Sequence, residues 1–286
     1  MSVFYISQLL GYTIGMYIAV DIGGTKTLIC ELDKSGKLLS KTRFETPKDY
    51  GEFIALFEKT FGGITLKSKP KYCVIGAPGK MDRERGIGVA FSNLPWEQVP
   101  LGKDIGRIIG VKAVIENDAN LAGLSEAVLL KNKYRKVLYI TVSTGIGGVL
   151  VINGKIDPEL ADTEFGTMMF EHQGRLQQWQ EFASGKAIVK KFGQKASDIT
   201  DPNAWYVIAH NIALGLTNVI NTLTPEVVVI GGGVGTHFDK YKDRLREDIQ
   251  LFGNNVVTIP EIVQAERAED AVIYGCYELG RQQHAQ

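Results

Sequence analysis

Short apolar runs separated by glycine-rich turns set the pattern of this chain. Residues 16–19 are apolar and lead into the turn 21–27, after which residues 28–32 resume the apolar run. Apolar runs on both sides of a glycine turn predict a strand, a turn and a second strand. Residues 38–45 are expected to add a third strand.

Helical and strand patterns alternate in the next part of the sequence. The apolar positions of residues 50–61 fall on one side of a helix, and residues 72–75 form a short apolar run typical of a buried strand. Residues 111–115 predict another strand, and residues 121–130 have a helical composition. Asp118 is therefore expected at the end of a strand and near the start of a helix.

The opening pattern then returns. Residues 137–142 and 149–152 predict two strands joined by the glycine turn 143–148. A third glycine cluster, residues 231–233, follows a predicted strand at residues 227–230. Two copies of one arrangement indicate two duplicated α/β domains.

The repeat also places the domain boundary. We expect an N-terminal α/β domain at residues 16–116 and a C-terminal α/β domain at residues 117–286. Residues 1–15 precede the periodic pattern and are treated as an extension. The last predicted helix, residues 269–282, is compatible with packing on either domain.

Composition and charge exclude several classes of protein. The 286 residues are 44% hydrophobic, so a sizeable core can form. Lys plus Arg and Asp plus Glu both number 32, and this balance disfavours nucleic acid or an acidic membrane surface as a partner. Cys30, Cys73 and Cys276 lie far apart, which favours a reducing cytoplasm. Residues 1–20 lack a basic start and contain glycines, so we expect neither export nor a membrane anchor.

The glycine turns are candidate phosphate cradles. Glycine adopts the required dihedral angles and lets backbone N–H groups approach phosphate oxygens closely. A single such turn can equally be a plain hairpin, so only the co-occurrence of several turns indicates phosphate binding. The sequence lacks a Walker motif, and the first turn leads into a strand, which disfavours a dinucleotide-binding fingerprint.

Two aspartates stand beside these turns. Asp21 precedes the first turn, where a carboxylate can hold hydrated Mg²⁺ against phosphates, although an aspartate there can also stabilise a turn. Asp118 can accept a proton from an attacking hydroxyl, or it can cap the following helix.

Taken together, these segments resemble the ROK family of sugar kinases. The resemblance rests on DIGGTKT (21–27), ENDAN (116–120), STGIGG (143–148) and PEVVVIGGG (225–233), in this order. Residues 93–96, 164–166 and 183–185 fall where the family has sugar-contacting segments. The resemblance implies the α/β fold of the actin/sugar-kinase superfamily: two ribonuclease-H-like domains, with ATP and sugar in an interdomain cleft.

The resemblance also implies roles for individual residues. Asp118 would be the catalytic base and Asp21 the carboxylate on the magnesium side. The implied ATP-binding residues are Gly23, Gly24, Thr25, Lys26, Thr144, Gly145, Gly147, Gly231, Gly232 and Gly233. The implied sugar-binding residues are Gly79, Asn93, Asn117, Asp118, Glu164 and Gln180.

The chain departs from the family pattern at two places. Thr167 occupies the position of a family histidine, and the cysteines of the family zinc motif are missing, so we expect no zinc. His172 lies nearby and is interpreted as a packing or surface residue. Gln180 replaces a glutamate, with Glu181 one position later, so the contact keeps hydrogen-bonding capacity but loses charge.

The sequence thus predicts a cytoplasmic hexose kinase that depends on ATP and Mg²⁺ and acts on the 6-OH of glucose or a close relative. Three alternatives stay open: a sugar-responsive regulator without activity, an ATPase that needs no sugar, and a kinase that also uses polyphosphate. The identity of the sugar and the oligomeric state, including a homodimer, are left open.

Overall fold

The computed structural model describes residues 15–253, 256–267 and 270–284, which divide into two compact units. One unit contains the described residues up to Leu121 and those from Val272 onward, and the other is Ala122–Ala271. The division falls inside helix α4 (Asp118–Leu130), a few residues after the boundary expected at 116/117. Residues 1–14 of the expected extension and Glu269 of the expected last helix lie outside the described residues.

The first unit is built on a mixed sheet with the strand order β3-β2-β1-β4-β8. Its strands are β1 (Met16–Ile22), β2 (Lys26–Leu32), β3 (Leu38–Glu45), β4 (Pro70–Ala77) and β8 (Ala113–Asn117). Strand β1 is antiparallel to β2 and parallel to β4, and β4 is parallel to β8. The carboxyl ends of β1, β4 and β8 therefore meet at one edge of this sheet, where the first predicted turn and Asp118 lie.

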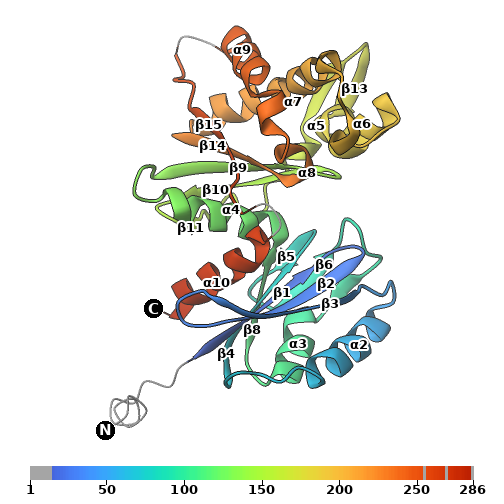
Figure 1. The fold of residues 1–286 in the computed structure, drawn as a ribbon, viewed down its shortest axis with the longest axis vertical. Helices are drawn as coiled ribbons and strands as arrows, with labels where there is room; N and C mark the ends of the chain where they lie inside the picture. The colour runs from blue at the N-terminus through green and yellow to red at the C-terminus, as the bar shows by residue number, and fades with distance from the viewer. Residues whose placement is uncertain (1–14, 254–255, 268–269, 285–286) are drawn as a thin grey trace. The chain divides into compact units, whose positions relative to one another are not determined.

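Helices cover both faces of this sheet (Figure 1). They are α2 (Tyr50–Gly62) and α3 (Leu101–Ile109) on one face and α10 (Ala271–His284) on the other. Side chains alternate along β1 because successive residues of a strand point to opposite faces. Ile18 and Val20 join the core beneath α2 and α3, whereas Tyr17 and Ala19 join the core beneath α10. The C-terminal helix thus packs on the first unit.

A small second sheet in the first unit was not predicted. It has the order β5-β6-β7, with β5 (Lys80–Asp82), β6 (Ile87–Ala90) and β7 (Glu97–Val99). These strands are too short for a hydrophobic period to show in the sequence. Trp96, next to β7, is 3% exposed and packs against Phe53 of α2 with ring centroids 4.7 Å apart.

The second unit repeats the arrangement of the first. Its main sheet has the order β11-β10-β9-β14-β15. The strands are β9 (Lys136–Val142), β10 (Ile146–Ile152), β11 (Lys155–Ile156), β14 (Val227–Gly231) and β15 (Glu261–Gln264). Strand β9 is antiparallel to β10 and parallel to β14, and β14 is parallel to β15, which is the same succession of directions as β1, β2, β4 and β8. The predicted duplication is confirmed in the pairing of the strands.

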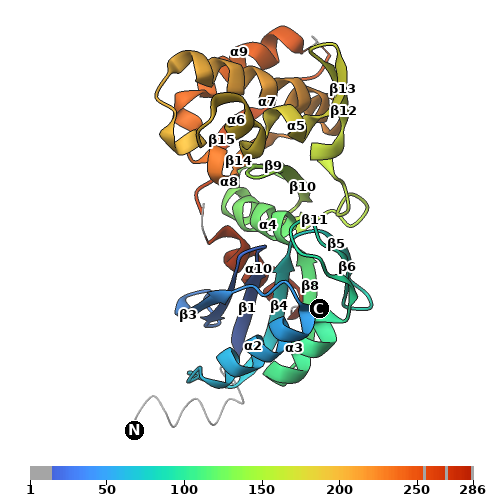
Figure 2. The same cartoon turned by 90° about the vertical axis from the view of Figure 1, so that its right-hand side faces the viewer.

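Helices also cover the second sheet (Figure 2). The remaining elements are η1 (Phe165–Thr167), β12 (Met169–His172), β13 (Arg175–Gln178), α5 (Trp179–Ala183), α6 (Gly185–Phe192), η2 (Ala196–Asp198), α7 (Pro202–Leu223), α8 (Gly232–Gly235), η3 (Phe238–Lys240) and α9 (Lys242–Phe252). Trp179 of α5 is fully buried against α7, where a Cβ at Gly215 would lie 2.2 Å from its ring. On the other face, α4 approaches at Gly123, where a Cβ would lie 2.2 Å from Val149.

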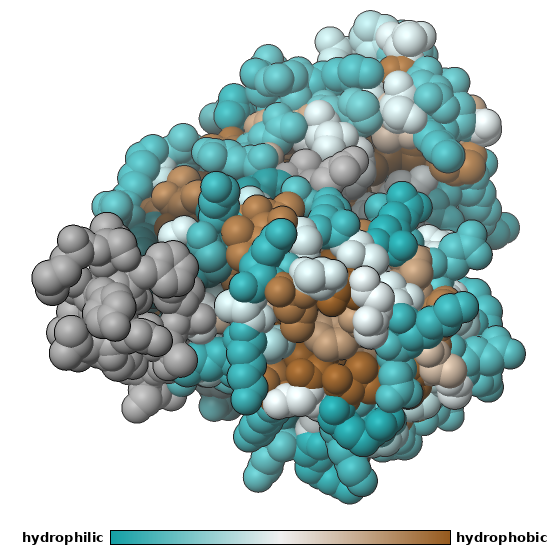
Figure 3. Space-filling model, turned by 60° about the horizontal axis from the view of Figure 1, so that its bottom comes forward, coloured by the Kyte–Doolittle hydropathy of each residue, from teal (hydrophilic) through white to brown (hydrophobic). Residues whose placement is uncertain are grey.

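On the face drawn in Figure 3, hydrophilic side chains predominate and apolar side chains reach the surface in places. In the first unit a groove of about 560 Å³ runs between β3 and α2, with Leu39, Thr42, Leu56 and Lys59 in its wall. None of the expected site residues lines this groove. Among the described residues, we find no helix with the length and apolarity needed to cross a bilayer.

Tyr241 offers a test of the packing in the second unit. Its side chain is 1% exposed and stacks on Trp205 with ring centroids 5.6 Å apart, and among the described residues its hydroxyl has no hydrogen-bond partner. Burial also raises the pKa of this hydroxyl. Because Tyr241→Phe removes an unsatisfied polar atom, we expect the unfolding free energy to stay equal or to rise by about 1 kcal/mol, measured by urea denaturation.

Tyr50→Phe is the matched control. The Tyr50 hydroxyl donates to Asp104 at 2.9 Å, so this substitution should lower stability by about 1 kcal/mol. A larger loss for Tyr241→Phe than for Tyr50→Phe would show that the Tyr241 hydroxyl has a partner in solution.

Candidate active site

The first glycine turn is closed by backbone hydrogen bonds. The N–H of Gly23 donates to the carbonyl of Lys26 at 2.9 Å, and the N–H of Thr46 donates to the carbonyl of Thr25 at 3.1 Å. Asp21 lies one residue before the end of β1 and pairs with Gly76 of β4. The turn predicted to bind phosphate therefore lies at the carboxyl ends of the parallel strands, where ligands bind in open α/β sheets.

Gly24 and Asn93 lie in direct contact although they are far apart in the sequence. A Cβ atom at Gly24 would lie 2.7 Å from the Cβ of Asn93 and 3.2 Å from its carbonyl oxygen. Only glycine permits this approach. The structure thus brings together one expected phosphate-binding residue and one expected sugar-binding residue.

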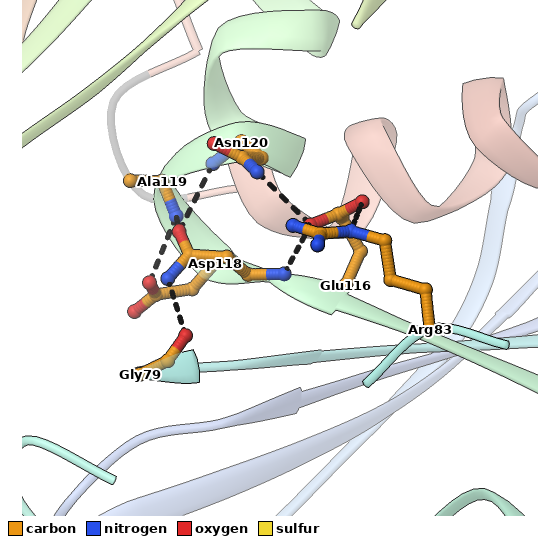
Figure 4. A network of polar contacts seen from close by, with 7 residues as sticks. Gly79, Arg83, Glu116, Asp118, Ala119 and Asn120 are labelled. Carbon is orange, nitrogen blue, oxygen red and sulfur yellow. Dashed lines mark hydrogen bonds and ion pairs between the residues drawn. The ribbon is translucent and has the colours of Figure 1, made fainter. Parts of the chain in front are cut away.

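The side chain of Asn117 organises the junction between β8 and α4. Figure 4 shows the polar network at this junction, with Gly79, Ala119 and Asn120 among its members. The Oδ1 atom of Asn117 accepts hydrogen bonds from the backbone N–H groups of Ala119 (2.9 Å) and Asn120 (3.3 Å), which makes it the cap of α4. Its Nδ2 donates to the carbonyl of Gly79 at 3.0 Å. Gly79 has φ of 122°, and a Cβ there would lie 2.1 Å from the carbonyl oxygen of Ala90, so the residue must be glycine.

Asp118 is the first residue of α4 and is half-buried. One of its carboxylate oxygens, Oδ1, accepts from the N–H of Ala119 at 2.8 Å. A carboxylate in the first turn of a helix is stabilised in its charged form by the helix dipole. The structure therefore holds the carboxyl group of Asp118 at the junction, next to Asn117 and Gly79.

An ion pair between Arg83 and Glu116, which the sequence did not predict, adjoins this junction. Arg83 makes a bidentate contact with Glu116, in which Nε donates to Oε2 at 2.8 Å and Nη2 to Oε1 at 2.7 Å. The Oε1 atom also accepts from the N–H of Asn117 (2.7 Å) and from Nδ2 of Asn120 (2.9 Å), and Glu116 is 5% exposed. The only sequence signal was a glutamate after an apolar strand. Its partner Arg83 is separated from it in the sequence by the strands β6 and β7 and the helix α3.

Asp21 is the residue expected to hold magnesium. In the described part of the chain, His, Cys, Asp and Glu side chains form no group of three that could bind a metal. Mg²⁺ keeps several of its waters and takes one or two carboxylates, so a single aspartate beside a turn predicted to bind phosphate fits this ion. Burial raises the pKa of the Cys276 thiol, and the nearby charge of Asp21 raises it further.

In the second unit, Gln180 lies between two glycine segments. Its Oε1 atom is 2.9 Å from the place where a Cβ of Gly145 would be and 3.2 Å from that of Gly166. Its Nε2 donates to the side chain of Gln178 at 2.9 Å. The turn containing Thr144 is closed by the N–H of Ser143, which donates to the carbonyl of Gly145 at 2.9 Å. Thus the structure brings Gln180 beside a turn predicted to bind phosphate.

Glu164 directly precedes the short 3-10 helix η1, and Thr167 is the last residue of that helix. Desolvation raises the pKa of the Glu164 carboxyl, and the charge of Asp162 raises it further. The Thr167 hydroxyl donates to the carbonyl of Glu164 at 2.8 Å. His172 of β12 stacks on Phe182, with ring centroids 4.2 Å apart and nearly parallel planes, which is a packing role.

The third glycine cluster joins β14 to α8. A Cβ at Gly231 would lie 2.3 Å from the hydroxyl of Tyr139. Gly232 has φ of 80°, and a Cβ there would lie 2.5 Å from the carbonyl of Val142. Gly233 is exposed and borders open space. Packing therefore requires the first two glycines, and the third leaves backbone accessible to a ligand.

These features define the class. The two units share one strand order, and in each unit a glycine turn joins the first two antiparallel strands. This is the α/β fold of the actin/sugar-kinase superfamily. The chain belongs to the ROK family, whose sequence profile matches residues 17–283.

Relatives in this family include sugar kinases. The chain is 25% identical to a glucokinase of Streptomyces coelicolor, over 94% of this chain and 98% of the relative. It is 26% identical to an N-acetyl-D-glucosamine kinase of Mannheimia succiniciproducens, over 92% of this chain and 99% of the relative.

Solved structures share the fold. A ROK family glucokinase from Streptomyces griseus, in complex with glucose and AMPPNP, has a TM-score of 0.79 at 24% identity and covers 94% of this chain and 100% of its own. A ROK family transcriptional regulator, a homologue of the E. coli MLC protein, has a TM-score of 0.81 at 18% identity, over 94% of this chain and 78% of its own. The fold therefore serves both enzymes and regulators.

The Arg83–Glu116 pair should contribute strongly to stability. Arg83→Met keeps the aliphatic part of the side chain but leaves a buried carboxylate without its cation. Removal of one partner of a buried pair typically costs 3–5 kcal/mol, and because Arg83 is partly exposed we expect about 3 kcal/mol in urea denaturation.

Arg107→Met is the matched control in the same unit, because the pair between Arg107 and Glu58 is exposed and 3.7 Å long. It should cost less than about 1 kcal/mol. If both variants lost the same small amount, Glu116 would not depend on Arg83.

Proposed function

We propose that this chain transfers the γ-phosphoryl group of ATP to a hydroxyl of a hexose, the 6-OH of glucose or of a close relative. The observation that carries the proposal is the carboxylate of Asp118, held at the β8–α4 junction beside Asn117 and Gly79. In phosphoryl transfer, a positioned carboxylate takes the proton of the attacking hydroxyl. The sugar kinases among the relatives support the same reaction.

The residues of the first unit would perform the proton transfer. The sugar oxygen forms a bond to phosphorus as the bond to ADP breaks, and its proton passes to Asp118. Asn117 has two N–H bonds on Nδ2, one of which serves the carbonyl of Gly79, and we assign the other to a sugar hydroxyl. Asn93 and Gly79 would add contacts from the same unit, and Glu164 and Gln180 would add contacts from the second unit.

The glycine turns would bind the nucleotide. The N–H of Gly23 closes the first turn, so the backbone N–H groups of residues 24–26, with those of residues 144–147, would bind phosphate oxygens, and residues 231–233 would bind the adenosine. Asp21 would hold Mg²⁺, which when bound balances the charge of the phosphates. The cytoplasm, with its ATP pool, is the expected location.

A sugar-responsive regulator is the second candidate, because a regulator has the same fold. An ATPase that needs no sugar is the third. The Asp118 carboxylate favours a kinase over a regulator, because sugar binding alone needs no proton acceptor at the hydroxyl. The polar residues Asn93, Asn117 and Glu164 favour a kinase over an ATPase, because an ATPase needs no hexose pocket.

Asp118→Asn tests the proposal directly. Asparagine keeps the shape and much of the hydrogen bonding but cannot accept the proton, so kcat should fall by about 100- to 10,000-fold. The KM for the sugar should stay within a few-fold. Kinetics in a coupled assay that follows ADP measure both constants.

Asp243→Asn is the control, since Asp243 is exposed on α9 and should leave kcat unchanged. Turnover of Asp118→Asn within a few-fold of the parent would require another base.

Sugar selectivity should be broad. Thr167 bonds to its own helix backbone, and Gln180 is held by Gln178, so few contacts around a sugar ring are fixed by charge. A site discriminates strongly only when a wrong substrate leaves its buried polar groups unpaired. We expect glucose and at least one of mannose, fructose and glucosamine to be phosphorylated. A preference for one hexose above about 10,000-fold in kcat/KM would show that the pocket is fully specified.

A further inference from the structure

Lys48 joins two segments of the candidate site. Its ammonium group donates to the carbonyl of Gly24 at 2.8 Å and to the carbonyl of Asn93 at 3.3 Å. Neither contact was visible in the sequence, because both partners are backbone oxygens far from Lys48 along the chain. The residue is exposed and is not required to fill the core.

The backbone of Lys48 is fixed independently of its side chain. Its carbonyl accepts a hydrogen bond from Nε1 of the buried Trp96 at 2.8 Å. Two residues earlier, the N–H of Thr46 donates to the carbonyl of Thr25. Hydrogen bonds therefore hold the backbone of Lys48 next to the first glycine turn, and from there its ammonium group reaches the carbonyl groups of Gly24 and Asn93.

The ammonium group of Lys48 stabilises the carbonyl groups of Gly24 and Asn93. Gly24 and Asn93 already lie closer together than a residue with a Cβ at position 24 would allow. Two carbonyl oxygens that converge on one ammonium group each gain a charge-assisted hydrogen bond, and without the ammonium group they would repel one another. Lys48 thus stabilises the close approach of the turn and the Asn93 segment.

We infer that Lys48 is a positioning residue that holds the first phosphate-binding turn against the sugar-binding segment at Asn93. This inference rests on the proposed function, and it adds to it a coupling between the two binding segments of the first unit. An ammonium group serves this purpose because it donates three hydrogen bonds and needs no fixed plane. Arginine can also donate to two carbonyls, whereas methionine cannot donate to either.

The test compares Lys48→Met with Lys103→Met, which removes an exposed lysine from α3 of the same unit. We expect Lys48→Met to lower kcat/KM for glucose by about 10- to 100-fold at an unchanged melting temperature. Lys48→Arg should recover most of this loss, and Lys103→Met should behave as the parent. Equal activity of Lys48→Met and Lys103→Met would overturn the inference.

A double-mutant cycle separates positioning from a general structural effect. If Lys48 acts by placing Asn93, then Lys48→Met should have less effect on the KM for glucose in a chain that also carries Asn93→Ala. Full additivity of the two substitutions would contradict positioning through Asn93.

Hydrogen exchange gives a readout that does not depend on activity. In Lys48→Met, the amides of residues 23–26 and of residues 91–96 should exchange faster together, while those of α3 keep the parent rate. Unchanged exchange in both segments would overturn the inference. A parent chain without kinase activity on any hexose would instead overturn the proposed function, and the exchange result would still report on the contact itself.

Discussion

The side chain of Asn117 makes the hydrogen bonds on which the arrangement of the first unit depends. Its amide oxygen caps helix α4, and its amide nitrogen holds the loop at Gly79. A buried strand, a helix start and a glycine loop are therefore fixed relative to one another by one residue. The Arg83–Glu116 pair also holds this junction in place, because Glu116 accepts hydrogen bonds from the backbone N–H of Asn117 and from the side chain of Asn120. These hydrogen bonds fix the backbone on both sides of Asp118 and so determine where its carboxyl group lies.

Close approach of backbone segments is the second constraint, and glycine makes it possible in both units. In the first unit it allows Gly24 to contact Asn93, and in the second it allows Gly145 to contact Gln180. A β-carbon at Gly24 would push the Asn93 segment away, whereas a β-carbon at Gly145 would displace the end of the Gln180 side chain. Glycine thus has two tasks in these turns: it leaves N–H groups accessible to phosphate, and it lets a second segment lie beside the turn.

Much of the architecture could be predicted from the sequence because the main strands are buried on both faces and read as apolar runs. The two hairpins and β14 are confirmed, and the helix that contains Asp118 begins where the sequence placed Asp118. The sheet β5-β6-β7 and the hairpin β12-β13 were missed, since short and partly exposed strands carry little periodicity. Lys48 and Arg83 were missed for another reason: their partners are distant in sequence, and a lone basic residue gives no pattern.

If this chain is a hexose kinase, it consumes ATP only when a sugar hydroxyl is present to receive the phosphoryl group. The direct measurement is ADP release by the parent chain with ATP and Mg²⁺, in the absence of sugar, with glucose, and with 6-deoxyglucose, which lacks the proposed acceptor. We expect ADP release with glucose and only background release in the other two cases. ADP release at the same rate without sugar would contradict this expectation.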